Sequence, residues 1–259
     1  MLDHDLDLLI DAARIAGRLS TSYIGETAKR WDKPDGAGPV TEADLAVNDM
    51  LSVVLQQARP DYGWLSEETE DSSARLSRNT VFIIDPIDGT RGFAAGERTW
   101  AHALAVAHKG VVTAAVVFLP MLDKIYVARK GGGARLNGSP IRVSDQKTLT
   151  DAAVLTTRPA LQDEHWRDGA PEVNFNYRPS LAYRMASVAE GRFDAMFTFR
   201  PTWEWDIAAG QLIIAEAGGA SSDKTGAPLR FNNAQPLLNG VVAGNPMVHR
   251  DTLAALAPS

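Results

Sequence analysis

Two aspartates follow an apolar stretch in residues 81–93, VFIIDPIDGTRGF. Four apolar residues lead directly into Asp85, and Asp88 comes three positions later. An unpaired carboxylate at the end of a buried strand would cost roughly several kcal/mol. A cation bound by both carboxylates would offset this cost, and Mg²⁺ prefers oxygen ligands. We therefore predict that Pro86 ends the strand and that the turn after it brings both aspartates to a divalent cation.

The next two residues, Gly89 and Thr90, open a new segment with free backbone N–H groups, which suit a phosphate. The ordinary alternative is an Asp-rich turn in which Thr90 caps a helix. Haloacid-dehalogenase phosphatases also combine strand-end acids with Asp-Gly-Thr, but one residue separates their aspartates. Here Pro86 and Ile87 intervene, so an aspartyl-phosphate mechanism is disfavoured.

Further acids strengthen the prediction of a metal-phosphate site. Glu67 and Glu68 end the segment WLSEE, and Asp206 precedes the apolar segment IAAGQLII. Asp44 lies three residues after Thr41. Each has a structural alternative: solvated loop acids for the glutamates, a helix N-cap for Asp206, and a capping box for Asp44. Their joint occurrence in this order carries the argument.

Composition excludes several other classes of protein. The 259 residues contain no cysteine, which rules out disulfides and thiolate metal sites. The net charge of −6 has the wrong sign for broad nucleic-acid binding. No apolar run approaches the ~20 residues of a membrane span, and an acidic N-terminus is unlike a signal peptide. We therefore expect a cytoplasmic protein that binds neither nucleic acid nor membrane.

Alternating helices and strands must position these acids. Helical periodicity predicts a helix over residues 5–19 and a second from Thr41 to just before Pro60, separated by a Gly/Pro-rich loop over 33–39. The remaining elements are expected as strands at 62–68, 81–86, 100–120, 124–144, 152–159, 193–199 and 239–246, and helices at 180–191, 205–219 and the C-terminus.

This pattern indicates an α+β fold. We expect two lobes: residues 1–145 would hold most of the metal ligands, and residues 146–259 would contribute Asp206 and substrate contacts.

Five segments together resemble the inositol monophosphatase superfamily: PVTEAD (39–44), SEE (66–68), DPIDGTRGF (85–93), GGGARLNGSPIRVS (131–144) and WDIAAGQLIIAEAGG (205–219). The resemblance implies a layered αβαβα sugar-phosphatase fold, shared with fructose-1,6-bisphosphatase. It also implies Mg²⁺-dependent, lithium-sensitive hydrolysis of a small phosphorylated metabolite, and a possible homodimer.

Carried over by position, the family motifs assign metal ligands. Glu67, Asp85 and the Ile87 carbonyl would hold one Mg²⁺. Asp85, Asp88 and Asp206 would hold a second, and Glu67 with solvent a weaker third, giving two or three ions per site.

The resemblance also assigns catalytic and substrate-binding roles. Asp44 and Thr90 would orient the nucleophilic water, assisted by Glu67 through its metal. The Gly89 and Thr90 N–H groups would receive the phosphate, next to Asp88 and Asp206. Glu68 would not bind a metal itself but would lie next to the metal ligands and support them.

The substrate is harder to assign. LSEE (65–68) and PTWEWDIAAGQ (201–211) are most similar to the bacterial CysQ type of 3′(2′),5′-bisphosphate nucleotidase, and Thr198 stands nearest the position of a sugar-binding Glu in inositol monophosphatases. DPIDGT with Ile87 is more typical of inositol and histidinol phosphatases. We favour the nucleotidase, with inositol-1-monophosphatase or histidinol-phosphatase as alternatives.

A role of another class, as an interaction partner of the transcription machinery, is a further alternative. Beside the substrate we expect Arg178, Tyr183 and Arg200.

Overall fold

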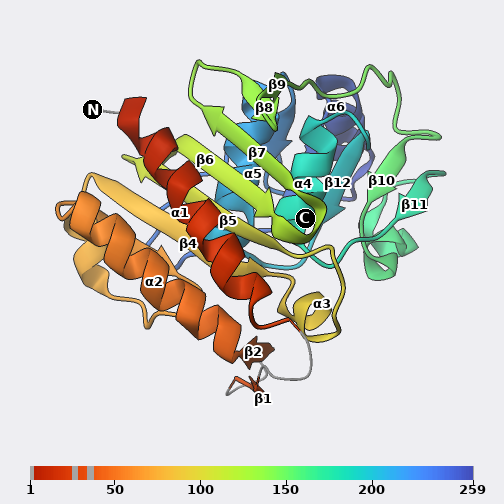
Figure 1. The fold of residues 1–259 in the computed structure, drawn as a ribbon. Helices are drawn as coiled ribbons and strands as arrows, with labels where there is room; N and C mark the ends of the chain where they lie inside the picture. The colour runs from red at the N-terminus through yellow and green to blue at the C-terminus, as the bar shows by residue number, and fades with distance from the viewer. Residues whose placement is uncertain (1–2, 25–28, 34–37, 259) are drawn as a thin grey trace.

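The computed structural model describes residues 3–24, 29–33 and 38–258; part of the expected loop at 33–39, residues 34–37, lies outside this range. Two helices, a mixed sheet, two further helices, a second sheet and a last helix follow one another in space (Figure 1). The predicted αβαβα fold is therefore confirmed.

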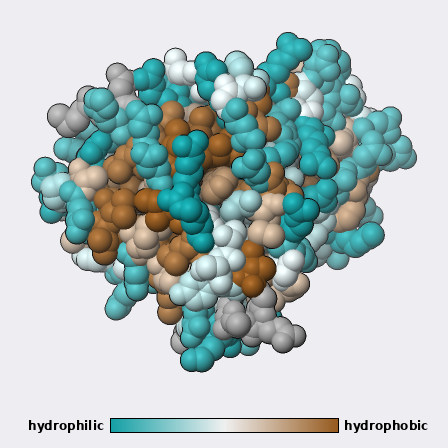
Figure 2. All heavy atoms as spheres, in the orientation of Figure 1, coloured by the Kyte–Doolittle hydropathy of each residue, from teal (hydrophilic) through white to brown (hydrophobic). Residues whose placement is uncertain are grey.

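The first layer consists of α1 (Asp3–Thr21) and α2 (Glu42–Ala58). Apolar residues recur at helical spacing, so each helix buries one face: Leu9 and Ala13 of α1 meet Leu51 and Leu55 of α2 above Phe82 of the sheet. In Figure 2, hydrophobic side chains are visible between hydrophilic ones over the area of these helices. In the described part of the chain, no helix is both long and apolar enough to cross a bilayer.

The first sheet has seven strands in the order β3-β4-β5-β6-β7-β8-β9. Only β3 and β4 pair in parallel; the other neighbours are antiparallel. The central strands are buried on both faces, which explains their nearly continuous Ala and Val content. The strands are β3 (Gly63–Ser66), β4 (Thr80–Asp88), β5 (Ala101–His108), β6 (Val111–Leu119), β7 (Lys124–Arg129), β8 (Ala134–Leu136) and β9 (Ser139–Pro140).

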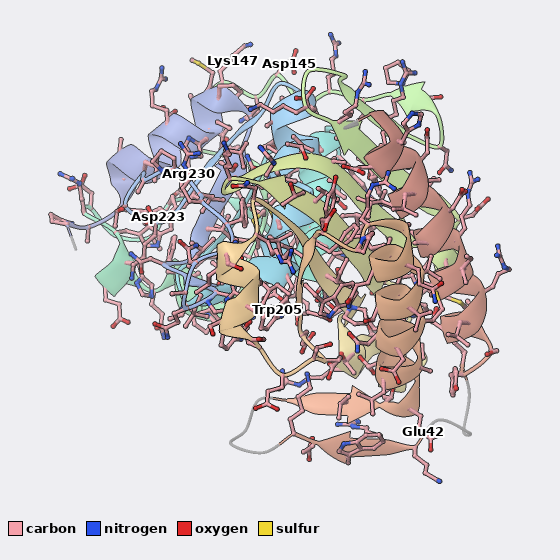
Figure 3. All side chains as sticks on the ribbon, turned by 90° about the vertical axis from the view of Figure 1, so that its left-hand side faces the viewer. Glu42, Asp145, Lys147, Trp205, Asp223 and Arg230 are labelled. Carbon is pink, nitrogen blue, oxygen red and sulfur yellow. The ribbon has the colours of Figure 1, made fainter. Side chains whose placement is uncertain are left out.

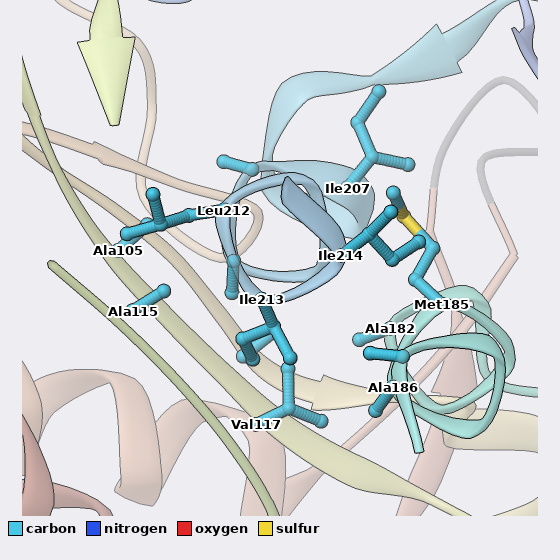
Figure 4. Packing of buried hydrophobic residues seen from close by; sticks show 14 of the residues in the cluster. Ala105, Ala115, Val117, Ala182, Met185, Ala186, Ile207, Leu212, Ile213 and Ile214 are labelled. Carbon is cyan, nitrogen blue, oxygen red and sulfur yellow. The ribbon is translucent and has the colours of Figure 1, made fainter. Parts of the chain in front are cut away.

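The middle layer is formed by α4 (Leu181–Ala189) and α5 (Glu204–Glu216). Figure 4 shows α5 between the first sheet, represented by Val117, and Met185 of α4. A Cβ at Gly210 would lie 2.5 Å from the Met185 Cβ, so only glycine permits this approach of the two helices. Every position of α5 from Ile207 to Ile214 is buried except Gln211, and this exception is also the only polar residue of that stretch.

The second sheet has five strands in the order β11-β10-β12-β16-β14, covered on its outer face by α6 (Pro246–Ala255). Its strands are β10 (Ala153–Leu155), β11 (Asn174–Asn176), β12 (Ala195–Thr198), β14 (Ala220–Ser222) and β16 (Val241–Gly244). One hydrophobic cluster includes residues of both sheets and of α4 and α5. The division into lobes near residue 145 remains a prediction.

Two small ribbons and a short helix complete the fold near one end of the first sheet. Strand β1 (Arg30–Asp32) pairs with β2 (Pro39–Thr41), and β13 (Thr202–Trp203) pairs with β15 (Leu237–Leu238). Helix α3 (Thr90–Ala94) directly follows β4.

Candidate active site

Strand β4 does not end at Pro86 but continues to Asp88, so the prediction of a strand end there is wrong. Asp85 pairs with Ala103 and Asp88 with Ala101, which leaves one extra residue on β4. In a regular strand, positions three apart face opposite sides of the sheet. The bulge shifts the alternation by one residue, so Asp88 returns to the face of Asp85. A bulge, rather than a turn, makes the two carboxylates converge.

Asp206 joins these two aspartates. One carboxylate oxygen from each of Asp85, Asp88 and Asp206 lies within 4.8 Å of the others. Asp85 is 1% exposed, and its Oδ1 has no hydrogen-bond partner among the described residues. Burial, together with Glu67 and the other acids, raises the pKa values of Asp85 and Asp206 well above their usual range. A buried acceptor left without a donor among like charges fits a hard cation, so the residues present suit Mg²⁺.

The second oxygen of Asp88 has a different role. Asp88 Oδ2 accepts hydrogen bonds from the Ser180 hydroxyl and the Ala182 N–H, both at 2.6 Å. Ser180 is the N-cap of α4, so this carboxylate fixes the start of that helix to the end of β4. Burial still raises the pKa of Asp88 to about 6 despite these donors. Ser180 was not singled out from the sequence, although a serine before LAYRMASVA is a typical N-cap signal.

The alternative roles of Asp206 and Thr90 as helix N-caps do not hold. Asp206 is the third residue of α5, whose N-cap is Trp203, and its carboxylate accepts a backbone hydrogen bond from Trp203. Thr90 is the first residue of α3, and Gly89 is the N-cap with φ +96°. That left-handed conformation favours glycine. The Asp206 and Thr90 side chains line the same cavity.

The capping box between Thr41 and Asp44 is present, but it uses only one of the two oxygens of the Asp44 carboxylate. Asp44 Oδ2 accepts from the Thr41 N–H at 2.9 Å and from the Thr41 hydroxyl at 2.5 Å. Asp44 Oδ1 lies 3.1 Å from the Thr90 hydroxyl. Burial raises the pKa of Asp44 to about 6, against the effect of these donors. The capping box is therefore confirmed, and the catalytic role of Asp44 stays a prediction that its second oxygen, facing Thr90, leaves open.

Glu67 and Glu68 follow β3 and share a cation from β1–β2. Lys33 Nζ lies 2.8 Å from Glu67 Oε1 and 2.6 Å from Glu68 Oε1. Burial lowers the pKa of Lys33, but the two glutamates outweigh burial and leave it raised. Burial and Glu67 raise the pKa of Glu68 to about 7. Sequence reasoning missed Lys33, because nothing in the sequence indicates that this loop folds back onto the acids.

His102 contacts the backbone of the bulge at Pro86. Its Nδ1 contacts the Pro86 carbonyl, and its Nε2 lies 3.0 Å from the Ser20 hydroxyl. A carbonyl only accepts, so Nδ1 carries the proton and Nε2 accepts from Ser20. The next carbonyl, that of Ile87, lies 3.1 Å from the Thr90 hydroxyl. No sequence motif quoted above includes His102, so the sequence did not indicate this role.

The acids open onto a cavity of about 280 Å³. Its walls also carry Arg91, Tyr177, Arg200, Trp203 and Trp205. Figure 3 shows Trp205 toward the middle of the molecule in that view.

Of the three residues expected beside the substrate, Arg200 lines this cavity, whereas Tyr183 and Arg178 do not. Tyr183 is 2% exposed within the hydrophobic core. Arg178 is absent from the cavity wall, and its carbonyl accepts from Arg184. Thr198 is likewise buried in β12, away from the wall.

Comparisons with known proteins cover the whole chain. The model of the inositol monophosphatase family matches residues 1–259. An inositol-1-monophosphatase of Mesorhizobium japonicum is 34% identical over 97% of this chain and 95% of its own. The Nus factor SuhB of Escherichia coli is 31% identical over 96% and 94%. The crystal structure of extragenic suppressor protein suhB from Bartonella henselae superposes with a TM-score of 0.83 at 28% identity, covering 96% of each chain. The chain is therefore a phosphatase that belongs to the inositol monophosphatase family.

Proposed function

We propose that the protein hydrolyses inositol monophosphate with Mg²⁺ as cofactor. The observation that carries the metal dependence is the buried Asp85 Oδ1, which has no hydrogen-bond donor among the described residues and belongs to a cluster with Asp88 and Asp206. When bound, Mg²⁺ supplies an acidified water and positive charge for the phosphoryl oxygens. Glu67, Asp85, Asp88, Asp206 and the Ile87 carbonyl would hold two or three ions.

The remaining groups of the site orient the reactants. The Thr90 hydroxyl donates to Asp44, which leaves its oxygen free to accept a hydrogen bond from the attacking water. As the water's proton moves to Thr90, the hydroxyl proton of Thr90 would pass to the Asp44 carboxylate. Asp44 in turn is held by Thr41, so the pair is fixed before substrate arrives. Gly89 and Thr90 line the cavity where the phosphate would lie, and Glu68 holds Lys33 beside Glu67.

Inositol-1-phosphate is favoured over adenosine 3′,5′-bisphosphate by the relatives. Two of them, from Mesorhizobium japonicum and Rhizobium meliloti, are named inositol-1-monophosphatase and are 34% and 36% identical to this chain. This reverses the preference drawn from the sequence motifs. The test is kcat/KM with Mg²⁺ for inositol-1-phosphate, adenosine 3′,5′-bisphosphate and histidinol phosphate. We expect inositol-1-phosphate to lead, and a tenfold preference for either of the others would overturn the assignment.

The bisphosphate nucleotidase remains the second candidate because of the cavity wall. Arg200 and the exposed Trp203 stand there, where a guanidinium suits a second phosphate and an indole suits a base. Arg200→Gln separates the two candidates. It would reduce kcat/KM for the bisphosphate far more than for inositol-1-phosphate if the nucleotidase is correct.

A role of another class is supported by the relatives named Nus factor SuhB. Capture of transcription proteins by wild type and by Asp88→Asn tests it. Equal capture by both, with activity lost in Asp88→Asn, would indicate an interaction role that does not depend on hydrolysis.

A further inference from the structure

A second cavity of about 340 Å³ adjoins the catalytic one. Both are lined by Glu67, Trp203 and Trp205, so the two indoles stand at their common boundary. The other walls of the second cavity come from two segments far apart in sequence: Ser66, Thr69 and Asp71 on one side, and Ala234, Gln235 and Pro236 on the other. Of the residues that line it, only Glu67 and Trp203 were given a role above.

The two indoles at the boundary form a fixed aromatic surface. The rings of Trp203 and Trp205 stack with centroids 4.8 Å apart and planes 9° apart. Trp203 also lies in β13, paired with Leu237 of β15, so its backbone is held as well. Trp203 is nevertheless 42% exposed. An immobilised, partly exposed indole beside a reaction centre provides a face on which a planar ring can stack at low entropic cost.

The far wall is held in place by a buried acid. Glu204 is 0% exposed and accepts from the Asn232 N–H at 2.6 Å, the Asn233 N–H at 2.9 Å and the Asn233 side-chain amide at 2.7 Å. Arg75 donates to Asn232 Oδ1 at 2.7 Å and to the Asn233 carbonyl at 2.9 Å. These contacts fix the segment just before Ala234, so the cavity is pre-formed.

The charge of Asp71 is already compensated. Arg75 Nε and Nη2 donate to its two carboxylate oxygens at 2.6 and 2.8 Å. Side chains of Trp203, Trp205, Ala234 and Pro236 supply apolar surface around it. The cavity therefore suits an uncharged ring better than an ion or a second phosphate.

We propose that the second cavity is a leaving-group subsite for an uncharged planar ring, stacked on Trp203 while the phosphoryl group lies at the aspartates. The proposal rests on the phosphate monoesterase activity. It extends the substrates beyond polyol phosphates to phosphate esters of aromatic or heteroaromatic alcohols.

The test compares 2-naphthyl phosphate, whose ring would enter the subsite, with glycerol 2-phosphate, which has no ring, under the same Mg²⁺. The measured quantity is the ratio of their kcat/KM values. Trp203→Ala should lower that ratio at least ~10-fold, about 1.4 kcal/mol, whereas Trp203→Phe should retain most of it. Ala234→Trp, which fills the cavity from the opposite wall, should lower the ratio to a similar extent.

Trp31→Ala is the matched control, because Trp31 is also 42% exposed and lines neither cavity. Its ratio should equal that of wild type. An unchanged ratio in both Trp203→Ala and Ala234→Trp would overturn the subsite. If Trp203→Ala does not fold, the ratio measured for Ala234→Trp is sufficient to test the subsite. Hydrolysis of glycerol 2-phosphate but not of 2-naphthyl phosphate by wild type would also overturn the subsite. Failure of wild type to hydrolyse inositol-1-phosphate as well as both esters with Mg²⁺ would instead count against the proposed function.

Discussion

The Thr90 hydroxyl lies 3.1 Å from Asp44 Oδ1 across 46 positions of sequence. The other oxygen of the same carboxylate accepts from Thr41, at the start of α2. Asp44 thus joins the beginning of a helix to the catalytic cavity, and a substitution of Asp44 would disturb both. Thr90 offers the cleaner experiment, because in the described part of the chain its hydroxyl contacts only Asp44 and the Ile87 carbonyl.

We predict that Thr90→Val lowers kcat by roughly 100-fold, the scale of a positioned proton acceptor. Valine keeps the shape of threonine but removes the hydroxyl that faces Asp44. Thr90→Ser keeps the hydroxyl and should stay within a few-fold of wild type. Steady-state kinetics measure both, with thermal unfolding as a check on the fold. Wild-type kcat in Thr90→Val would show that the hydroxyl has no part in the reaction.

Metal removal is the second prediction. Activity should require Mg²⁺, disappear in EDTA and decrease in Li⁺. Mg²⁺ should also raise the melting temperature, and by more at pH 7.5 than at pH 5, because protons compete for carboxylates such as Asp88, whose pKa is about 6. Asp206→Asn should diminish the Mg²⁺-induced shift in melting temperature. Full activity in excess chelator would contradict the metal assignment.

Sequence patterns predicted most of the framework because each pattern is local. Helical periodicity located α1 and α2, and the acids that follow an apolar run pointed to Asp85 and Asp88 as site residues. The bulge could not be predicted, since it depends on how β4 registers with Ala101 and Ala103 of β5. Without that pairing, the sequence around Pro86 looks like a turn.

Contacts between distant segments account for the residues that were missed. Lys33, Ser180 and His102 reach the site across 34, 92 and 16 positions, and none belongs to a motif with chemical meaning of its own. The wrong expectation for Tyr183 has a different origin. Helix α4 is buried at all nine positions, a burial that its small and apolar composition could have signalled. Tyr177, just before that helix, is the tyrosine that lines the cavity.

The third prediction concerns Glu204, the first residue of α5. Glu204→Ala would leave three donors of Asn232 and Asn233 without their acceptor. We expect the free energy of unfolding to fall by about 3 kcal/mol, as for several buried polar groups left unpaired. Glu42→Ala is the matched control: Glu42 is the first residue of α2, and its side chain is 38% exposed in a surface pair with Lys29. It should cost less than about 1 kcal/mol. Equal losses in urea unfolding would contradict the role assigned to Glu204.

The last prediction is a pH dependence of stability that originates at His102. Burial lowers the pKa of His102 to about 4, despite its hydrogen bond to the Pro86 carbonyl. In the unfolded chain a histidine titrates near ~6.5. Between these values the unfolded state binds a proton that the folded state excludes. The stability from neutral His102 is therefore fully present above about pH 6.5 and is lost as the pH falls toward 4.

Relative to pH 7.5, this loss at pH 5.5 should be about 1.4 kcal/mol. His102→Gln serves as the reference, because a glutamine amide can still donate to Pro86 and accept from Ser20 but does not titrate. Urea unfolding of both proteins in EDTA at the two pH values gives the pH dependence of each, and the comparison is the difference between the two. The contributions of the site carboxylates cancel in it, as does that of His249, whose pKa is also lowered by burial. Equal pH dependence in wild type and His102→Gln would mean that His102 takes up its proton in the folded state as readily as in the unfolded chain.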